Sequence, residues 1–287
     1  MPGRHPLNLL LLVLPLLVAA VGWRNPVDAL ARGKWVRHFD TVIGQETGTV
    51  CIPAETWDEV PQYAAELPEV VARLRGVGAS VVGIDLPDEH LDEPALRAAA
   101  GDMPLVLPGD AHTQMRRSWA PELALGPMRK DVLPMSFVVW EAHTGTEHEW
   151  VGHDDHALFM PVLIPFHHWD RRDEWTAAEG DMVFIGACRA DRELTRYGRQ
   201  PAVVAHGEMV ETLIEGRFPR YTPLSVDLLL ALLTTLGVAL ARRRHIAAAI
   251  GVGAGMLAMV MLLSLTLTWF GWSGIVVGAI CGAVMKR

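Results

Sequence analysis

The stretch GDMVFIGACRADRELTRYGRQPAVVAHGEMVETLIEGR, residues 180 to 217, decides the fold of this chain. Its first part, Met182 to Gly186, is a short apolar run closed by glycine, which is typical of a buried strand. Polar residues follow from Arg189 onward, and Pro201 ends that loop. Apolar residues then recur at helical spacing up to Gly216. The stretch therefore predicts a strand, a loop and a helix in succession.

The residues before this stretch predict further strands that alternate with helices. Short apolar runs, rich in β-branched residues, predict four strands at Thr49–Ile52, Ser80–Ile84, Met103–Leu107 and Ser136–Trp140. Helices are expected over residues 70–77 and 94–100, each with a proline in or just before its first turn. This alternation predicts an α/β domain, in which a mostly parallel sheet carries helices on both faces.

Apolar segments at both ends of the chain predict a membrane part of four helices. Leu7 to Gly22 has a length between that of a signal peptide and that of a spanning helix. An uncleaved anchor is expected, and the alternative is a signal peptide cleaved at Ala20 to Gly22. The C-terminal block predicts three spans, at Leu224–Ala241, Ile246–Leu265 and Thr268–Met285. The expected division is a transmembrane anchor at residues 1–23, an α/β domain at 24–222 and three transmembrane helices at 223–287.

Basic residues set the expected orientation of these spans. Arg4, Arg242 to Arg244 and Lys286-Arg287 would all lie on one side, which the positive-inside rule assigns to the cytoplasm. Trp269 and Trp272 would lie at the opposite interface, which suits amphipathic rings. We therefore expect a multi-pass protein of the cytoplasmic (inner) membrane. Both termini would be cytoplasmic, and residues 24–222 would be periplasmic or extracellular.

Small residues recur at four-residue spacing in the last two apolar segments. They are Gly274, Gly278 and Gly282 in one segment, and Ala247, Gly251 and Gly255 in the other. Such stripes let helices approach closely in lipid, so they predict a hairpin of these two segments within one chain, or else the seam of a homo-dimer. Asp227 is expected in the first turn of its helix, where a carboxylate suits the helix dipole.

Composition limits the classes of function. The formal net charge is -8, and residues 24–222 alone hold 32 acidic and 19 basic side chains. An acidic surface repels phosphate backbones, so no nucleic-acid partner is expected. The sequence has no Cys-x-x-Cys, Gly-x-Ser-x-Gly, phosphate-binding loop or Gly-x-Gly-x-x-Gly motif. We therefore expect neither an enzyme nor a cofactor.

Polar residues close to predicted strand ends are candidate ligand contacts, because parallel sheets bind ligands beyond the carboxyl ends of their strands. The candidates are Glu55, Asp85, Arg189, Asp191 and His206. The alternative is that the carboxylates cap helices and solvate loops, and that His206 holds the turn before the last helix.

Two further groups of residues carry chemistry. Cys51 and Cys188 each lie at the carboxyl end of a predicted strand, and export would place them in an oxidising compartment. Either the two cysteines form a disulfide, or they remain unbonded and pack as small buried apolar residues. His153, Asp155, His156 and His167 include suitable ligand types for zinc, nickel or manganese. Neighbouring prolines and the lack of a His-Glu-x-x-His pattern favour solvated loops instead.

The opening stretch also resembles a known family. The residues that carry the resemblance are GDMVFIGA at 180–187, Asp191, Thr195, Tyr197-Gly198 and PAVVAHGEMVETLIEGR at 201–217. They are similar to the C-terminal signature of the CHASE-type domain (cyclase and histidine-kinase associated sensory extracellular), second variety. Ala202 replaces a usual glycine, Gly207 a usual alanine and Arg196 a common proline, while Glu55 stands where the family usually has aspartate.

The resemblance implies a bacterial membrane sensor, whose extracytoplasmic domain detects a stimulus and passes it through the transmembrane helices in signal transduction. Family members usually continue into a cytoplasmic cyclase or kinase, whereas this sequence ends at Lys286-Arg287. A separate membrane protein is therefore the expected output partner. The alternatives are a structural or assembly subunit that binds another protein and, more remotely, a metal-dependent exported enzyme.

Overall fold

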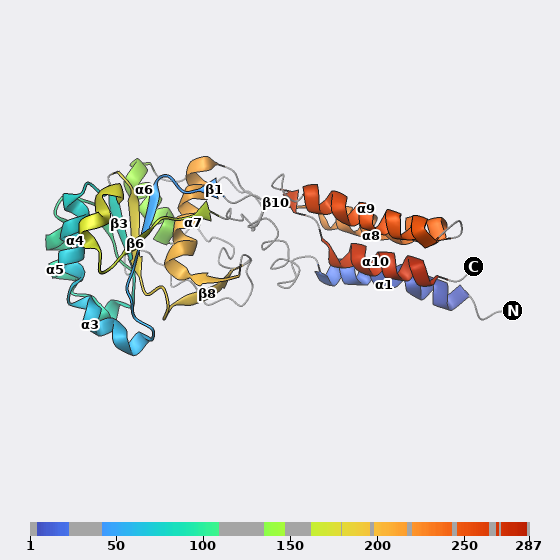
Figure 1. Ribbon diagram of the computed structural model, residues 1–287, viewed down its shortest axis with the longest axis horizontal. Coiled ribbons are helices and arrows are strands. Elements are labelled where there is room, and N and C mark those ends of the chain that lie inside the picture. Colours follow the sequence, from blue (N-terminus) through green and yellow to red (C-terminus); the bar gives the residue numbers. More distant parts are fainter. Residues whose placement is uncertain are drawn as a thin grey trace. The chain divides into compact units, whose positions relative to one another are not determined.

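The structure is a computed structural model that describes residues 5–22, 42–108, 135–146, 162–178, 180–195, 198–216, 220–242, 246–263, 268–269 and 271–285 (Figure 1). The chain divides into two compact units. The α/β unit is Asp40–Phe218, and the helical unit combines Met1–Phe39 with Pro219–Arg287. The chain thus leaves the helical unit once and returns to it once.

A five-stranded sheet in the order β4-β3-β7-β2-β6 forms the centre of the α/β unit, and all of its pairings are parallel. Its strands are β2 (Thr47–Cys51), β3 (Val81–Asp85), β4 (Leu105–Val106), β6 (Phe166–His168) and β7 (Met182–Gly186). The apolar strand of the opening stretch is β7, and it occupies the middle position. Val183 pairs with Gly48 of β2 on one side and with Val82 of β3 on the other. The prediction of an α/β fold with a parallel sheet is confirmed.

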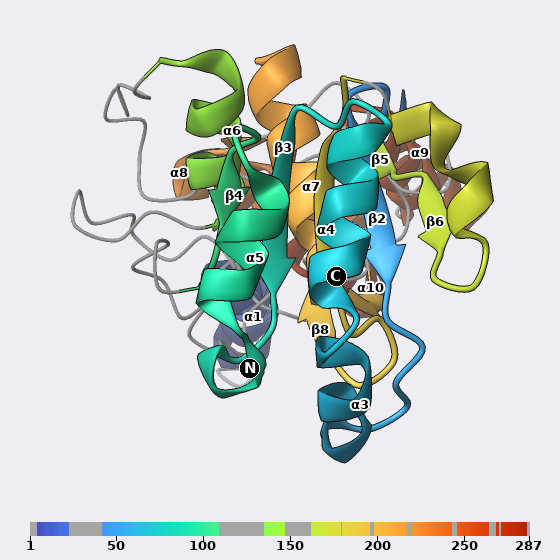
Figure 2. The same cartoon turned by 90° about the vertical axis from the view of Figure 1, so that its left-hand side faces the viewer.

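Helices cover both faces of this sheet (Figures 1 and 2). Residues alternate between the faces along each strand. Val82 and Ile84 pack in the core beneath α4 (Leu67–Gly76) and α5 (Glu93–Ala100). Val81 and Phe184 belong to the second core, together with residues of α6 (Met135–Thr144) and α7 (Ala202–Glu215). The sheet is thus buried on both sides, which explains its nearly continuous apolar strands.

Shorter elements connect these layers. They are β1 (Val42–Ile43) and β5 (Val162–Leu163), which pair in parallel, and the antiparallel hairpin of β8 (Arg192–Thr195) and β9 (Gly198–Pro201). Short helices are η1 (Trp57–Glu59), α3 (Val60–Ala64), η2 (Asp88–His90) and η4 (Arg172–Ala178). The β8–β9 hairpin lies in the polar segment that was expected to be a loop.

One predicted strand is wrong. Ser136–Trp140 lies inside helix α6, because a short apolar run fits a buried helix as well as a buried strand. The helix packs against β3 at Gly83, where a Cβ would come within 2.9 Å of Val139. The sheet has β6 instead of the strand predicted at Ser136–Trp140. Strand β6 lies in a segment rich in histidine and proline, which was expected to be a loop.

The helical unit contains α1 (His5–Gly22), α8 (Leu224–Arg242), α9 (Ile246–Leu263) and α10 (Ser273–Val284), together with the short pair β10 (Arg220–Tyr221) and β11 (Thr268–Trp269). Two of the described helices, α8 and α9, are long and apolar enough to cross a membrane. The apolar helical stretches Leu7–Val21 and Ser273–Val284 are shorter. The third C-terminal span was expected to begin at Thr268, but α10 begins only at Ser273.

The glycine stripe of α10 packs against α8, and the predicted α9–α10 hairpin seam is wrong on this point. A Cβ at Gly278 would lie 2.8 Å from the Ala231 carbonyl oxygen, and one at Gly282 would overlap the backbone of Thr235. Gly251 of the other stripe has nothing within 4 Å of a Cβ position among the described residues. Glycine therefore brings α10 close to α8, whereas α9 keeps an open face.

Polar contacts join the two ends of the α8–α10 pair. At one end Asp227, in the first turn of α8, accepts a hydrogen bond from the Gly271 N–H before α10 (3.0 Å). The same oxygen accepts a bond from the Thr222 hydroxyl (2.8 Å). At the other end Arg242 donates to the carbonyl oxygen of Ala283. Asp227 therefore links the start of α8 to the turn before α10.

Candidate functional site

Helix α7 is the element on which the candidate site is built. Pro201 precedes it with extended backbone angles, and Gly216 ends it in the left-handed region with a φ of 63°. Glycine adopts that conformation without the steric cost that other residues pay. Every residue from Ala202 to Leu213 is buried. The polar side chains of a helix buried in this way find most of their hydrogen-bond partners inside the protein.

The close approach of α7 to the sheet depends on Gly186, the last residue of β7. A Cβ at this position would overlap Val203 of α7 and would lie 3.2 Å from the carbonyl oxygen of Asp85. The first turns of α7 therefore lie directly against the carboxyl ends of β7 and β3. Three of the expected site residues, Asp85, Arg189 and His206, lie at this edge or follow it directly.

His206 is buried where α7 packs against the sheet, and only 2% of its surface is exposed. Its ring stacks on Phe184 with centroids 5.7 Å apart, and Nε2 lies 3.6 Å from Oδ2 of Asp85. Burial lowers the pKa of His206 to about 4, so the imidazole is neutral at physiological pH. Nδ1 has no hydrogen-bond partner among the described residues. The structure thus brings the buried His206 together with Asp85, whose side chain is 25% exposed.

Glu55 and Arg189 form a second pair at the surface. They make an ion pair between the segment after β2 and the turn after β7, and both side chains are more than half exposed. Exposed pairs of this kind contribute little to stability. The backbone of Asp191 connects the turn after β7 to α7. Its N–H donates a hydrogen bond to the carbonyl oxygen of Ala187, and its own carbonyl oxygen accepts one from the N–H of Ala202 at the start of α7. The five candidates therefore form two separate pairs and a backbone contact.

A disulfide joins Cys51 at the end of β2 to Cys188 just after β7. Their Cα atoms are 5.2 Å apart, and the two residues are 137 positions apart in the sequence. The bond spans two neighbouring strands at the carboxyl edge, since Cys51 pairs in register with Gly186. It therefore fixes the segment that carries Arg189 against the end of β2.

The amino ends of the same strands hold residues that the sequence interpretation did not select. Oε1 of Glu211, a buried residue of α7, accepts a 2.7 Å hydrogen bond from the Thr47 hydroxyl and a 3.0 Å bond from the Glu46 N–H. We call this group of three residues the Glu211 latch. Gly44 makes room for it, because a Cβ there would lie 2.9 Å from Oε1. The latch ties the later turns of α7 to the start of β2.

Asp181, just before β7, adds a third carboxylate to this end of the sheet. Partial burial, together with the charges of Glu211 and Glu46, raises the pKa of Asp181 to about 6. Protonation of Asp181 near that pH would remove one of several charges that repel each other. The cluster can therefore take up a proton in the mildly acidic range.

His167 of β6 lies beside the same cluster. A Cβ at Gly48 would meet Nε2 of His167 at 2.7 Å and Oδ2 of Asp181 at 3.9 Å, so both side chains border the same face of β2. Burial lowers the pKa of His167, and its Nε2 has no hydrogen-bond partner within the described ranges. Burial of the imidazole therefore favours its neutral form.

Glu208 is the third ionisable residue buried in α7, and none of its surface is exposed. It accepts a 2.6 Å hydrogen bond from the side-chain amide of Gln200 in β9. The sequence did offer a signal for these residues, because Glu208 and Glu211 interrupt an otherwise apolar helical stretch. Buried acidic residues are rare unless they are paired.

Of the four candidate metal ligands, only His167 lies in the described part of the chain. His153, Asp155 and His156 lie outside the described residues. Within the described ranges, no group of three or more His, Cys, Asp or Glu side chains could hold a metal ion. His167 faces the start of β2 instead, as described above.

Comparisons with protein-family models, with curated proteins and with solved structures found no match for this chain. The class of protein that the structure supports is an α/β unit whose last buried helix is followed in the sequence by the apolar helices of a second unit. Function is therefore inferred from the contacts of α7 and from the sequence.

Proposed function

We propose that this chain is a membrane-anchored sensory protein, in which the α/β unit detects a stimulus and α7 relays it to the apolar helices. One observation carries the proposal. A single buried helix holds three ionisable side chains, and each of them contacts a different strand. His206 lies against Asp85 of β3, Glu208 accepts from β9 and Glu211 accepts from β2.

Such a helix suits a relay, because a change in any of these contacts alters how α7 is held. Buried polar contacts have strict geometry, and their loss is costly, so they favour discrete arrangements over gradual deformation. The chain also provides the connection. Helix α7 ends at Glu215 and α8 begins at Leu224, so only residues 216–223 lie between them.

In this role the helical unit lies in the cytoplasmic membrane, with α1, α8, α9 and α10 as its crossings. Two of these helices have the length and hydropathy for a span. The arginines and lysines at the two termini and after α8 then lie on the cytoplasmic side. The α/β unit lies in the periplasm or outside the cell, which agrees with its disulfide. A separate membrane protein receives the signal.

Binding of candidate small-molecule stimuli is tested on the full-length chain in mild detergent. Its unfolding midpoint is recorded with a panel of free amino acids, nucleotides, sugars and organic acids. A sensor of small molecules is expected to gain stability with rising concentration of at least one class, because a ligand that binds the native state stabilises it. The same ligand is expected to change hydrogen exchange along α7. If no class has either effect, sensing of these molecules is contradicted.

A second candidate function is that of an assembly subunit. Leu163 of β5 and Phe166 of β6 are large apolar residues that are 54% and 47% exposed, and β6 is an edge strand of the described sheet. Exposed apolar residues beside a sheet edge suit a protein partner. Co-purification of one partner in fixed ratio, lost in a Leu163→Ser and Phe166→Ser variant, would favour this function over sensing.

A further inference from the structure

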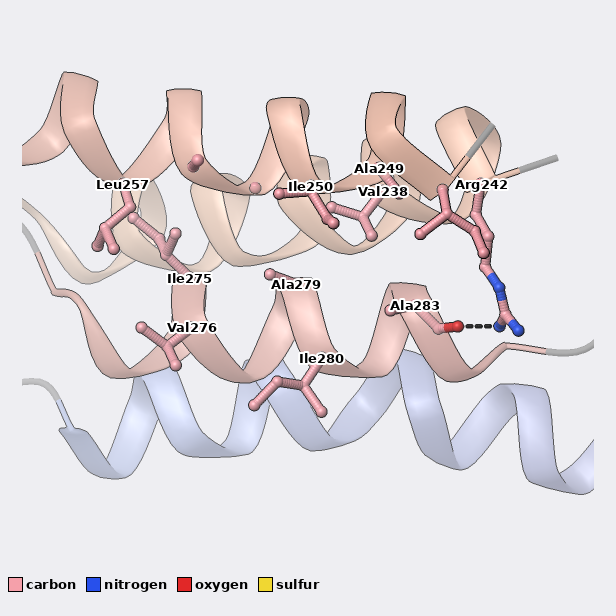
Figure 3. Close-up of a pocket in the computed structure, with 13 residues that line it drawn as sticks. Val238, Arg242, Ala249, Ile250, Leu257, Ile275, Val276, Ala279, Ile280 and Ala283 are labelled. Atoms are coloured by element: carbon pink, nitrogen blue, oxygen red, sulfur yellow. Dashed lines mark hydrogen bonds between the residues drawn. The ribbon is translucent and has the colours of Figure 1, made fainter. Parts of the chain in front are cut away.

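The helical unit contains a groove between α8, α9 and α10 with a volume of about 560 Å³ (Figure 3). Small and branched aliphatic residues line it, with α9 on one side and α10 on the other. Arg242 is the one charged residue among those that line the groove, and it lies at one end.

The groove exists because the three helices pack unequally. Helix α10 lies close to α8 through its glycines, as described above, and Gly253 of α9 approaches Ala279 of α10, where a Cβ would lie 3.3 Å away. Alanine and glycine fill little of the remaining space between α9 and α10. Only 11% of the α9 span is buried. Most of α9 must therefore be covered by something other than the described helices.

The charged end of the groove has its own chemistry. One guanidinium N–H of Arg242 donates to the Ala283 carbonyl oxygen, and no other hydrogen bond or ion pair of Arg242 is found among the described residues. The guanidinium has five donors, and they match the geometry of phosphate. Arg243 and Arg244 follow α8 in the sequence, and Lys286-Arg287 follow α10. The sequence therefore has further basic residues just after the last residues of α8 and α10.

We propose that this groove binds an anionic phospholipid of the cytoplasmic leaflet. An acyl chain lies along the apolar walls, and the phosphate binds Arg242. Basic pockets between membrane helices on the cytoplasmic side bind anionic headgroups in this manner. The inference rests on the membrane placement under the proposed function, but not on the sensory role.

The volume favours a lipid chain over a helix of a second copy. An α-helix with its side chains is about 10 Å across and rises about 5.4 Å per turn. Three turns would therefore occupy roughly twice the volume of the groove. Helices α9 and α10 of a second copy would bring no acidic side chain to Arg242, whereas an anionic headgroup complements its charge.

The test uses the full chain, purified in detergent and exchanged with mixed vesicles of phosphatidylglycerol and phosphatidylcholine that carry the same acyl chains. Bound lipid is counted by native mass spectrometry. We expect a preference for phosphatidylglycerol of about fivefold, the factor for one basic residue near an anionic headgroup. Inorganic phosphate at millimolar concentration is expected not to displace the lipid, because it lacks the chain.

Three variants separate the two parts of the ligand. Arg242→Gln is expected to abolish the preference while some lipid of either kind remains bound. Ala254→Phe, which fills the groove, is expected to lower the binding of both lipids. Ala248→Phe is the matched control, because Ala248 is exposed on the same helix but does not line the groove. It is expected to bind lipid like the wild type.

Equal retention of the two lipids by the wild type overturns the inference, and so does an unchanged preference in Arg242→Gln. Neither result affects the membrane placement, which is judged separately by whether the chain needs detergent for extraction. A chain that is extracted without detergent overturns both the placement and the lipid site.

Discussion

The hydroxyl of Thr47 donates a 2.7 Å hydrogen bond to Oε1 of Glu211, which lies 164 residues further along the chain. The bond joins the first residue of β2 to the late turns of α7, so it links the beginning and the end of the α/β unit. Both residues are buried, and neither can exchange this bond for one to water without movement of the helix.

The first prediction concerns this latch. Glu211→Ala would leave the Thr47 hydroxyl and the Glu46 N–H without their acceptor, at a cost of about 1–3 kcal/mol in the free energy of unfolding. Urea unfolding of the full chain in detergent measures the change. Glu215→Ala is the control, because Glu215 is exposed one turn later on the same helix. Equal stability of the two variants would show that the latch does not hold α7.

The second prediction concerns the pH dependence of stability. The pKa of Asp181 is about 6 in the folded chain and close to 3.8 when unfolded. The folded state therefore binds more protons between these values, and this residue's contribution to stability falls as pH rises from about 4 to about 6. Above pH 6 Asp181 is charged in the folded chain, and its full destabilising effect is present. His206 acts in the opposite sense, because its lowered pKa makes stability fall as pH drops from about 6.5 to about 4.

Because both groups titrate, the comparison is made between variants. Asp181→Asn is expected to raise the unfolding midpoint at pH 7 and to change it little at pH 4, relative to the wild type. Asp170→Asn, at an exposed position, serves as control and should leave the difference between the two pH values unchanged. A gain from Asp181→Asn that is equal at both pH values would refute the charge-repulsion account.

The third prediction concerns the two cysteines at the carboxyl edge. Protein that has been exported in the cell and purified without reductant is expected to show one free thiol in denaturant, that of Cys281. After reduction it is expected to show three. The double variant Cys51→Ser and Cys188→Ser is expected to lose about 2–4 kcal/mol, because the bond closes a long loop in the unfolded chain. Three thiols before reduction would mean that the bond does not form in the cell.

The sequence predicted those elements whose pattern is local. Strand β7 and helix α7 follow directly from an apolar run, a proline and a helical period, and the parallel sheet follows from the alternation of strands and helices. The segment Ser136–Trp140 was assigned wrongly because its run of four apolar residues is too short to show a distinguishing period. Strand β6 was missed because its three residues carry two histidines and lie beside a proline.

The contacts of the site could be predicted only in part. Asp85 and His206 were selected because both lie near the ends of predicted elements, and the structure brings them to 3.6 Å. The Glu211 latch was not predicted, because its partners lie 164 residues apart and sit at the amino ends of the strands. Only a parallel sheet with β2 beside β7 brings Thr47, at the amino end of β2, close to α7. That register is a tertiary property.

The last prediction concerns Asp227 in the helical unit. Its Oδ1 accepts bonds from the Thr222 hydroxyl and the Gly271 N–H, and the side chain is buried. Asp227→Ala removes the acceptor for both donors, so we expect a loss of about 1–3 kcal/mol in stability. Asp227→Asn keeps an acceptor oxygen and should lose less. Unfolding of the full chain by titration with a denaturing detergent measures both.

Ser225→Ala is the matched control for Asp227, because Ser225 lies in the same first turn of α8 but is exposed. It is expected to unfold like the wild type. If Asp227→Ala also unfolds like the wild type, the bond to Gly271 does not hold α8 to the start of α10. The glycine stripe that packs α10 against α8 would then be the main contact between these helices, and Gly278→Leu should cause the larger loss.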